Sequence, residues 1–160
     1  MYNIFFMKCL LPIVSDLKNP ALNQSHMDQI TSILGGDIFD NDSFKFGRLV
    51  ELHAYNFVDQ VAAISAQATN EHQLQEMLNS VRNILDTIQY TINPCKFQKA
   101  CYLLDGTEDI LAQLDDAEAT ISSVRSSKYI APLRSKADEL MKNVRQVQYI
   151  AHLLDVVQSQ

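Results

Sequence analysis

Residues 132–157, PLRSKADELMKNVRQVQYIAHLLDVV, carry the clearest structural signal in this 160-residue chain. Apolar side chains recur along them at steps of three and four residues: Leu133, Ala137, Leu140, Val144, Val147, Ile150 and Leu154. This spacing places the apolar side chains on one face of an α-helix and is close to the heptad repeat of packed helices. The segment therefore predicts a long amphipathic helix that is buried along one side.

The sequence before this segment continues the helical pattern. Residues 107–125 have the same apolar spacing, and a central helical segment begins near Arg48 with a join or kink expected at Thr69. A shorter helix is expected to begin at Ser25, whose side chain suits a helix N-cap, and to end at Gly35, because glycine adopts the left-handed C-terminal conformation easily. The chain is thus expected to be built mainly from helices.

The period changes between residues 88 and 104. Apolar and polar side chains alternate from Ile88 to Ile92, which is the period of a β-strand, and residues 100–104 could form a return strand. The predicted fold class is mainly α, an elongated helical bundle with a small two-stranded β-ribbon inserted between its helices.

Two regions are expected along the chain. The first, at 1–46, holds N-terminal helices and a loop pinned by aromatic residues. The second, at 47–160, is the helical bundle with its β-ribbon near 88–104.

Composition narrows the function classes. The chain is 47% hydrophobic and 20% charged, with a net charge of -6, and contains only four Gly and four Pro. We expect no nucleic-acid partner, because binding to phosphates needs clustered basic residues. We also expect no membrane partner, because the apolar N-terminal residues 2–14 are shorter than a membrane span, which needs about 20 residues. These residues also lack the basic start and cleavage site of a signal peptide.

The three cysteines, Cys9, Cys95 and Cys101, are too few for a disulfide framework and favour a reducing compartment. Cys95 and Cys101 could face each other across the predicted ribbon, so their pairing stays open, although two reduced thiols are favoured.

No local motif indicates catalysis or metal binding. The sequence has no P-loop, GxGxxG, GxSxG or HExxH motif, and no two of its four histidines are three or four residues apart: His26, His53, His72 and His152. The acidic cluster at residues 115–118 is interpreted as a solvated helix face. We therefore predict no catalytic, cofactor-binding or metal-binding residue, no cofactor, and no enzyme activity.

Four short motifs, in their order along the chain, resemble the linker region of dynein heavy chains, which precedes the motor ring. Residues 11–26 resemble the family pattern LPxxxxLxNPAxxxxHW, and residues 64–74 resemble ISxxAxxExxLE. Residues 94–109 are similar to the end of a ribbon followed by LLKGxDEI, and residues 127–133 to SRYVAPF. Val157-Gln158 falls where the family has the VQ of WxxVQxxWxYLE. The first two motifs look more like the axonemal branch of the family.

The chain departs from the family pattern in having no tryptophan. The pattern would place tryptophans at four positions that are apolar here: Met27, Leu85, Leu140 and Leu154. We expect the core to be retained with smaller side chains.

The resemblance implies the first part of a dynein linker, a rod of helical bundles that lies across the AAA+ ring and bends with the nucleotide cycle. The chain is then expected to be a heavy-chain fragment and a non-catalytic mechanical element that transmits ATP-driven conformational change to the tail in microtubule-based motility. The implied partners are the AAA+ ring, the remaining linker and the tail of the same heavy chain. The implied location is the cytoplasmic cytoskeleton of the ciliary or flagellar axoneme.

Two other hypotheses stay open. The chain could be a spectrin-like helical scaffold or tethering module that binds protein partners. It could also be a small enzyme with Cys95 or Cys101 as nucleophile. An isolated fragment could in addition dimerise through apolar residues near its C-terminal end, Leu153, Leu154, Val156 and Val157.

Overall fold

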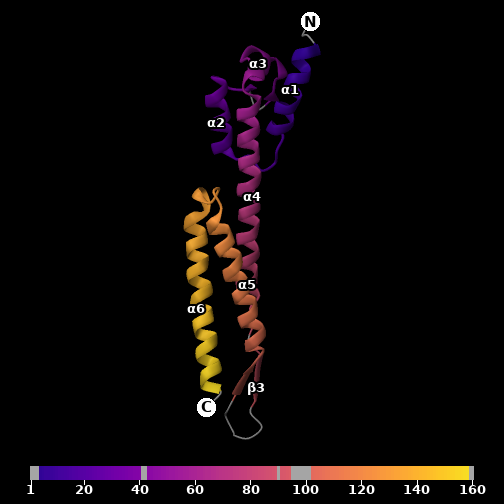
Figure 1. Cartoon of the computed structure of the whole chain (residues 1–160). Helices are drawn as coiled ribbons and strands as arrows, with labels where there is room; N and C mark the ends of the chain where they lie inside the picture. The colour runs from indigo at the N-terminus through magenta and orange to yellow at the C-terminus, as the bar shows by residue number, and fades with distance from the viewer. Residues whose placement is uncertain (1–3, 41–42, 90, 95–101, 159–160) are drawn as a thin grey trace. The chain divides into compact units, whose positions relative to one another are not determined.

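The computed structural model is mainly α-helical and divides into two compact units, Met1–His72 and Gln73–Gln160. The boundary falls inside the long helix α4 (Val58–Thr87), which contributes residues to both units (Figure 1). The division predicted between residues 46 and 47 stays a prediction. The structure describes the following residues: 4–40, 43–89, 91–94 and 102–158.

Unit 1 is built from short helices beside the N-terminal part of α4 (Figure 1). They are α1 (Ile4–Leu17), α2 (Gln24–Leu34), α3 (Phe46–Glu51) and the 3-10 turn η1 (Ala54–Asn56). Each of these elements, and α4, contributes to one apolar core: Leu10, Ile13, Ile30, Leu34, Ile38, Leu49, Ala54, Val61 and Ile64. Burial of these side chains is the main favourable term that holds the short helices in place.

Two helix boundaries in unit 1 test the sequence predictions. Gly35 ends α2 in the left-handed conformation with a φ of 75°, as expected. The predicted N-cap at Ser25 was wrong, because Asn23 is the N-cap and its side chain accepts the backbone N–H of His26. Asparagine and serine cap equally well, and tertiary contacts of the first turn favour the earlier start.

The predicted join at Thr69 was also wrong, because α4 is one helix of 30 residues. The Thr69 hydroxyl donates to the Ser65 carbonyl at 3.1 Å, and the Asn70 side chain donates to the Ala66 carbonyl at 2.7 Å. Polar side chains that could have started a new helix instead bond to carbonyls four residues earlier in the same helix.

Unit 2 packs the C-terminal part of α4 with α5 (Thr107–Ser126), the 3-10 turn η2 (Ala131–Leu133) and α6 (Arg134–Gln158). Its buried core draws on all three long helices: Leu78, Val81, Ile110, Leu114, Ala117, Ile121, Val124, Ile130, Ala137, Leu140, Met141 and Val144. The arrangement is a three-helix core, with α5 and α6 lying side by side (Figure 1).

The inner face of α6 follows the predicted apolar spacing as far as Val147 and then departs from it. Ala151 is fully buried, whereas Ile150 is 51% exposed. The inward-facing series is therefore Ala137, Leu140, Val144, Val147, Ala151 and Leu154, of which Val147 and Leu154 are half-buried. Its heptad spacing continues into the C-terminal part of the helix. The prediction that Ile150 belongs to the buried stripe was wrong.

The predicted fold class was correct in being mainly α and wrong in its β element. The pairing does not begin at Ile88 as expected, because the Ile88 N–H bonds to the Ile84 carbonyl at 3.1 Å and continues the winding of α4. The Ile88 side chain packs against the unit 2 core at the end of α4. Its apolar character therefore follows from helix packing and not from a position in a strand.

Among the described residues, β structure is limited to two short antiparallel pairs that form no larger sheet. One pair is β3 (Thr91–Pro94) with β4 (Tyr102–Asp105), and Ile92 lies opposite Leu104. The other is β1 (Phe39–Asp40) with β2 (Ser43–Phe44), inside the segment predicted as an aromatic loop. Such short pairs are marginal by themselves, so the architecture rests on helix packing.

Candidate functional site

Polar residues of unit 1 meet where the two N-terminal sequence motifs come together. This polar junction consists of Asn19, Asn23, His26, Ser65, Thr69 and Glu71. The first three belong to the segment from α1 to α2, and the last three lie on α4. The junction therefore joins parts of the chain that are more than 40 residues apart in sequence.

Asn19 makes the largest number of contacts in the junction. It lies in the turn after α1, where the following Pro20 disfavours helical backbone angles. Its Oδ1 accepts the N–H of Ala21 at 3.0 Å, which shapes the turn. Its Nδ2 donates toward the carbonyl and the hydroxyl of Ser65, both at 3.0 Å, and toward the hydroxyl of Thr69 at 2.8 Å. One side chain thus holds the turn and attaches it to α4.

His26 makes the second attachment. It is 2% exposed and lies three residues after the N-cap Asn23, where its Nδ1 accepts the Asn23 N–H at 3.3 Å. Asn23 Oδ1 accepts the His26 N–H at 3.1 Å, which completes a capping box with histidine in the place usually taken by Glu or Gln.

The same ring reaches α4 with its other nitrogen. Because Nδ1 is an acceptor, the ring proton lies on Nε2, which is 3.1 Å from Oε2 of Glu71. The other carboxylate oxygen of Glu71 accepts from the Gln67 side chain at 2.7 Å. The Glu71 side chain is only 13% exposed, so both of its oxygens are satisfied within the protein.

The geometry of the junction suits mechanical attachment. Its polar groups are partnered with one another, and breaking a pair that involves the buried His26 or Ser65 would leave a buried donor or acceptor unsatisfied, which costs about 1–3 kcal/mol. The contacts are also directional, so they fix the orientation of the turn and of α2 on α4. By this geometry the chain is a helical module whose polar motif residues cross-link elements distant in sequence.

No site residue was expected from the sequence, and that prediction stays untested. Asn19 and His26 lie within the first motif, at residues 11–26, and Ser65 and Glu71 lie within the second, at residues 64–74, but their contacts were not predicted. The available signal was the presence of polar residues at motif positions between apolar ones.

The other candidate residues are dispersed. His72 and His152 are exposed, and His53 Nδ1 lies 2.8 Å from the Tyr55 hydroxyl. Within the described part of the chain, no three His, Cys, Asp or Glu side chains are grouped so that they could hold a metal ion. Cys9 is a half-buried free thiol, whereas Cys95 and Cys101 lie outside the described residues.

The acidic cluster of α5 is paired with α6. Asp115 accepts from the Gln148 side chain at 2.9 Å, and Glu118 accepts two N–H groups of Arg145 at 3.0 and 2.9 Å. The hydrogen bond from Arg145 holds the pKa of Glu118 below its ordinary value, and this effect outweighs the desolvation that would raise it. The cluster therefore contributes one ion pair and one hydrogen bond across the α5–α6 surface.

Comparison with known proteins identifies the family. The family described as "Dynein heavy chain, N-terminal region 2" matches residues 2–160. The chain belongs to the dynein heavy chain family, as the four motifs predicted.

The chain is similar to axonemal and flagellar relatives. It is 32% identical over 144 residues to human dynein axonemal heavy chain 6, which covers 89% of this chain and 4% of the relative. It is 29% identical over 155 residues to human dynein axonemal heavy chain 2, covering 96% of this chain and 4% of the relative. It is 29% identical over 129 residues to the dynein-1-beta heavy chain of the flagellar inner arm I1 complex of Chlamydomonas reinhardtii. That match covers 76% of this chain and 3% of the relative. No solved structure matches the chain.

The four apolar positions where the family pattern has tryptophan differ in burial. Leu140 is buried in the core of unit 2, and Leu85 packs against that core. Met27 packs against the core of unit 1, and Leu154 is half-buried. Three of the four positions therefore contribute to the apolar cores, and the expectation that the core is retained with smaller side chains stays a prediction. No described helix has the combined length and apolar character that a membrane crossing requires.

Proposed function

We propose that this chain is the first part of a dynein heavy chain linker and acts as a non-catalytic mechanical element. It would transmit ATP-driven conformational change from the AAA+ ring toward the tail. The chain spans about 4% of the length of the human relatives that it matches, so the ring, the remaining linker and the tail are its proposed partners within one heavy chain.

The polar junction is the observation that supports this proposal most. A mechanical element must keep its parts in a fixed orientation under load, and directional, partly buried hydrogen bonds resist rotation better than apolar contacts alone. Asn19 and His26 supply such bonds between the α1–α2 segment and α4. They also occupy the motif positions on which the resemblance to the linker rests.

The relatives that match the chain are named as axonemal or flagellar dyneins. We therefore place the proposed function in the cytoskeleton of a cilium or flagellum, in microtubule-based motility.

The proposal can be tested by substituting this chain for the matching region of human dynein axonemal heavy chain 6. We expect the chimera to hydrolyse ATP and to move microtubules. With Asn19→Ala in the chimera, ATP hydrolysis should persist while microtubule gliding slows, because the junction no longer transmits force. Asn70→Ala serves as the matched control, since the half-buried Asn70 side chain donates to the Ala66 carbonyl within the same helix α4. Equal gliding of both variants would count against the mechanical role.

A second candidate function is a spectrin-like scaffold or tethering module. The three-helix core of unit 2 favours it, because such a core is also how tethering bundles are built. In that case the chimera should fail to move microtubules even though its junction is intact.

The non-catalytic character needs its own measurement. The purified 160-residue chain should release no phosphate from ATP above the buffer rate. Turnover that follows the chain through purification and is lost on thiol alkylation would support the enzyme hypothesis instead.

A further inference from the structure

Helix α6 has a second stripe of side chains at helical spacing, which faces away from the core. It consists of Asp138, Lys142, Arg145, Tyr149, Leu153 and Val156, at steps of four, three, four, four and three residues. All six side chains are exposed. The same helix therefore has one apolar stripe toward the core and another regular, exposed stripe, in which Asp138 and Arg145 pair with side chains at the edge of α5.

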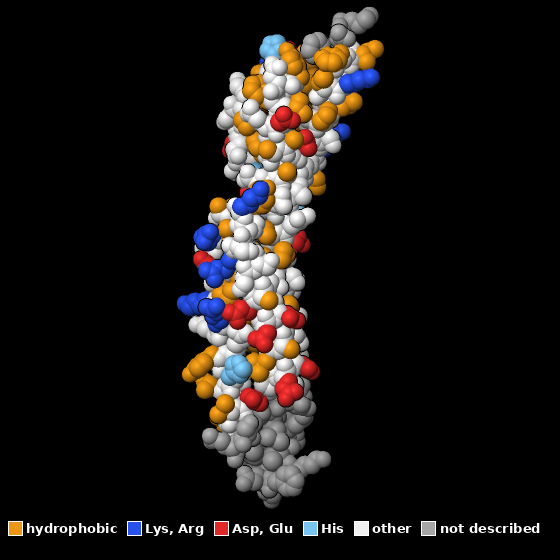
Figure 2. Space-filling model, viewed as in Figure 1, with side chains coloured by type: hydrophobic (Ala, Val, Ile, Leu, Met, Phe, Trp, Pro, Cys, Tyr) orange, Lys and Arg blue, Asp and Glu red, His pale blue; other side chains and the backbone are white. Residues whose placement is uncertain are grey.

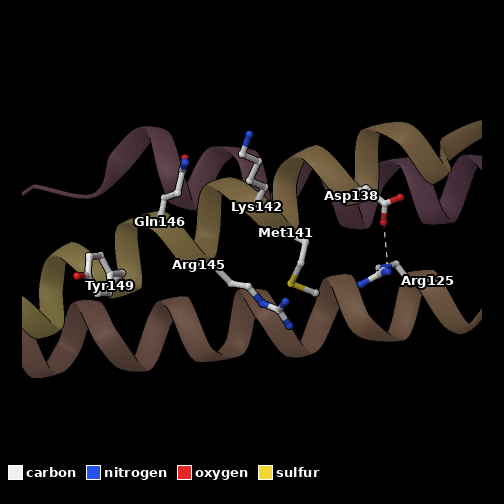
Figure 3. Close-up of a pocket in the computed structure, with 7 residues that line it drawn as sticks. All are labelled: Arg125, Asp138, Met141, Lys142, Arg145, Gln146 and Tyr149. Carbon is white, nitrogen blue, oxygen red and sulfur yellow. Dashed lines mark ion pairs between the residues drawn. The ribbon is translucent and has the colours of Figure 1, made fainter.

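The N-terminal half of this outer stripe borders a groove between α5 and α6 with a volume of about 480 Å³ (Figure 3). Met141 and Arg145 point from α6 toward α5, and Arg125 of α5 pairs with Asp138 at 3.1 Å (Figure 3). Tyr149 lies at the other end of the groove and is 66% exposed. The groove thus has polar walls at one end and an aromatic side chain at the other.

The charged side chains that line the groove are mostly cationic, although the chain as a whole carries a net charge of -6. They are Arg125, Lys142 and Arg145, with Asp138 as the one acidic residue of the lining. Lys142 has no ion-pair partner among the residues that the structure describes. Figure 2 shows Lys and Arg side chains gathered over the N-terminal part of α6.

The C-terminal half of the outer stripe is apolar. Leu153 is 46% exposed and Val156 is 56% exposed, and the adjoining Ile150 and Val157 are 51% and 71% exposed. Hydrophobic side chains form a patch over this part of α6 in Figure 2. Contiguous exposed apolar side chains of this kind mark an interaction surface.

We propose that the outer stripe of α6 and the groove beside it bind an amphipathic helix of a protein partner, with acidic residues toward Lys142 and apolar residues along Tyr149, Leu153 and Val156. Steps of three and four residues match the ridges and grooves through which helices pack. The excess of cations at one end sets the charge of the partner and its direction along the groove.

A second copy of this chain fits the surface less well. Two α6 stripes in antiparallel arrangement would place Lys142 and Arg145 of each copy against the apolar half of the other. The acidic residues of α5 are already engaged with α6, through Glu118 to Arg145 and Asp115 to Gln148. A membrane surface fits less well because the cations lie at one end of the apolar patch and do not flank it.

The test uses the 160-residue chain and two fluorescent peptides of about 20 residues, long enough to form an amphipathic helix. Both peptides have leucines at steps of three and four, and one carries glutamates where the other carries lysines. In fluorescence anisotropy titrations we expect the glutamate peptide to bind at least about tenfold more tightly at low salt. The difference should shrink as salt rises, because screening weakens exposed charge pairs.

Variants locate the binding surface. Lys142→Glu should weaken the binding of the glutamate peptide by about fivefold or more, and it should strengthen the binding of the lysine peptide. Lys18→Glu introduces the same charge change in unit 1 and should alter neither affinity. Leu153→Ala should weaken both peptides equally. Circular dichroism controls for the fold, which these exposed substitutions should preserve.

Three outcomes would overturn the proposal. The first is equal binding of the two peptides, or no binding. The second is a concentration-dependent dimer in sedimentation equilibrium that Leu153→Glu dissociates, which would assign the surface to a second copy. The third is binding to phosphatidylserine vesicles without binding to either peptide.

Discussion

The two units place their polar groups differently. In unit 1, buried and half-buried polar side chains connect segments that are distant in sequence, as when Asn19 reaches the buried Ser65. In unit 2, the contact between α5 and α6 is an apolar seam, and the polar pairs, such as Arg145 with Glu118, lie at its exposed edge. Unit 1 should therefore depend on a few specific hydrogen bonds, and unit 2 on the volume and continuity of its apolar core.

This difference follows from how the helices are connected. The α5–α6 pair is joined by a short connection, and long helices that are neighbours in sequence can bury an apolar stripe without polar guidance. The helices of unit 1 are short, with 14 residues in α1 and 11 in α2, so each buries less apolar surface. Directional polar contacts supply the orientation that short helices do not provide by themselves.

The largest effect should come from interrupting the apolar seam of unit 2. Val144 is fully buried in the middle of α6. Val144→Pro removes a helix hydrogen bond and introduces a backbone clash, which costs about 3 kcal/mol or more. We expect unit 2 to unfold, with loss of helical signal in circular dichroism. Val144→Ala keeps the helix and should only lower the melting temperature, and unchanged melting of the proline variant would refute the dependence on a continuous seam.

The next largest effect should come from the polar junction. Asn19→Ala removes the donor that serves Ser65 and Thr69, and we expect a loss of about 2–3 kcal/mol in the free energy of unfolding. Asn19→Asp keeps the shape but replaces the donor with an acceptor that faces the Ser65 carbonyl, so it should be no more stable than Asn19→Ala. Urea denaturation measures both. A loss no larger than that of Asn70→Ala would show that unit 1 is held by apolar packing alone.

A smaller effect should separate the two roles of His26. His26→Gln can preserve the capping box, because glutamine is a usual residue at this position, but its side chain no longer supplies the contact to Glu71. His26→Ala loses both contacts and should cost about 1–2 kcal/mol in the free energy of unfolding. We expect the glutamine variant to fall between the wild type and the alanine variant in thermal melting. His72→Ala, at an exposed histidine, is the matched control.

The smallest effect should come from the exposed edge of unit 2. The pKa of Glu118 is lowered in the folded protein, so its pairing with Arg145 stabilises the fold above the ordinary carboxyl pKa. This contribution is lost as pH falls through the lowered pKa. Glu118→Gln should therefore lower the free energy of unfolding by less than about 1 kcal/mol at neutral pH. The difference from wild type should disappear in acid.

Salt and a neighbouring acid provide the controls for this measurement. Raising the salt concentration at neutral pH should reduce the effect of Glu118→Gln, because the pair is exposed. Asp116→Asn changes an exposed acid of α5 that has no ion-pair partner among the described residues, and it should leave the unfolding curve unchanged. A pH-independent difference for Glu118→Gln would mean that the pair contributes by packing and not by charge.

Helices could be predicted from the sequence wherever a long apolar repeat was present, but details set by tertiary packing could not. In α6 the apolar repeat predicted the buried face as far as Val147. It then placed Ile150 on that face, because isoleucine is more apolar than the neighbouring Ala151. The structure instead keeps the heptad step and buries the alanine. Regular geometry of the seam outweighed the hydrophobicity of one side chain.

The β element and the polar junction show two further limits. Alternation from Ile88 indicated a strand, yet Ile88 completes the last turn of α4, since a short apolar alternation also fits the end of a helix. The junction could not be predicted because its pairs are 45 to 50 residues apart, as between Asn19 and Thr69. The only indication in the sequence was that the residues of the junction lie within the two N-terminal family motifs.

The absence of tryptophan has a consequence for spectroscopy. Met27 packs against the core of unit 1 and Leu85 against that of unit 2, and both stand where the family pattern has tryptophan. Because the chain has no other indole, Met27→Trp or Leu85→Trp would each introduce a single fluorophore whose emission reports on one unit. A pair of such variants would let the unfolding of the two units be followed separately in the same solvent.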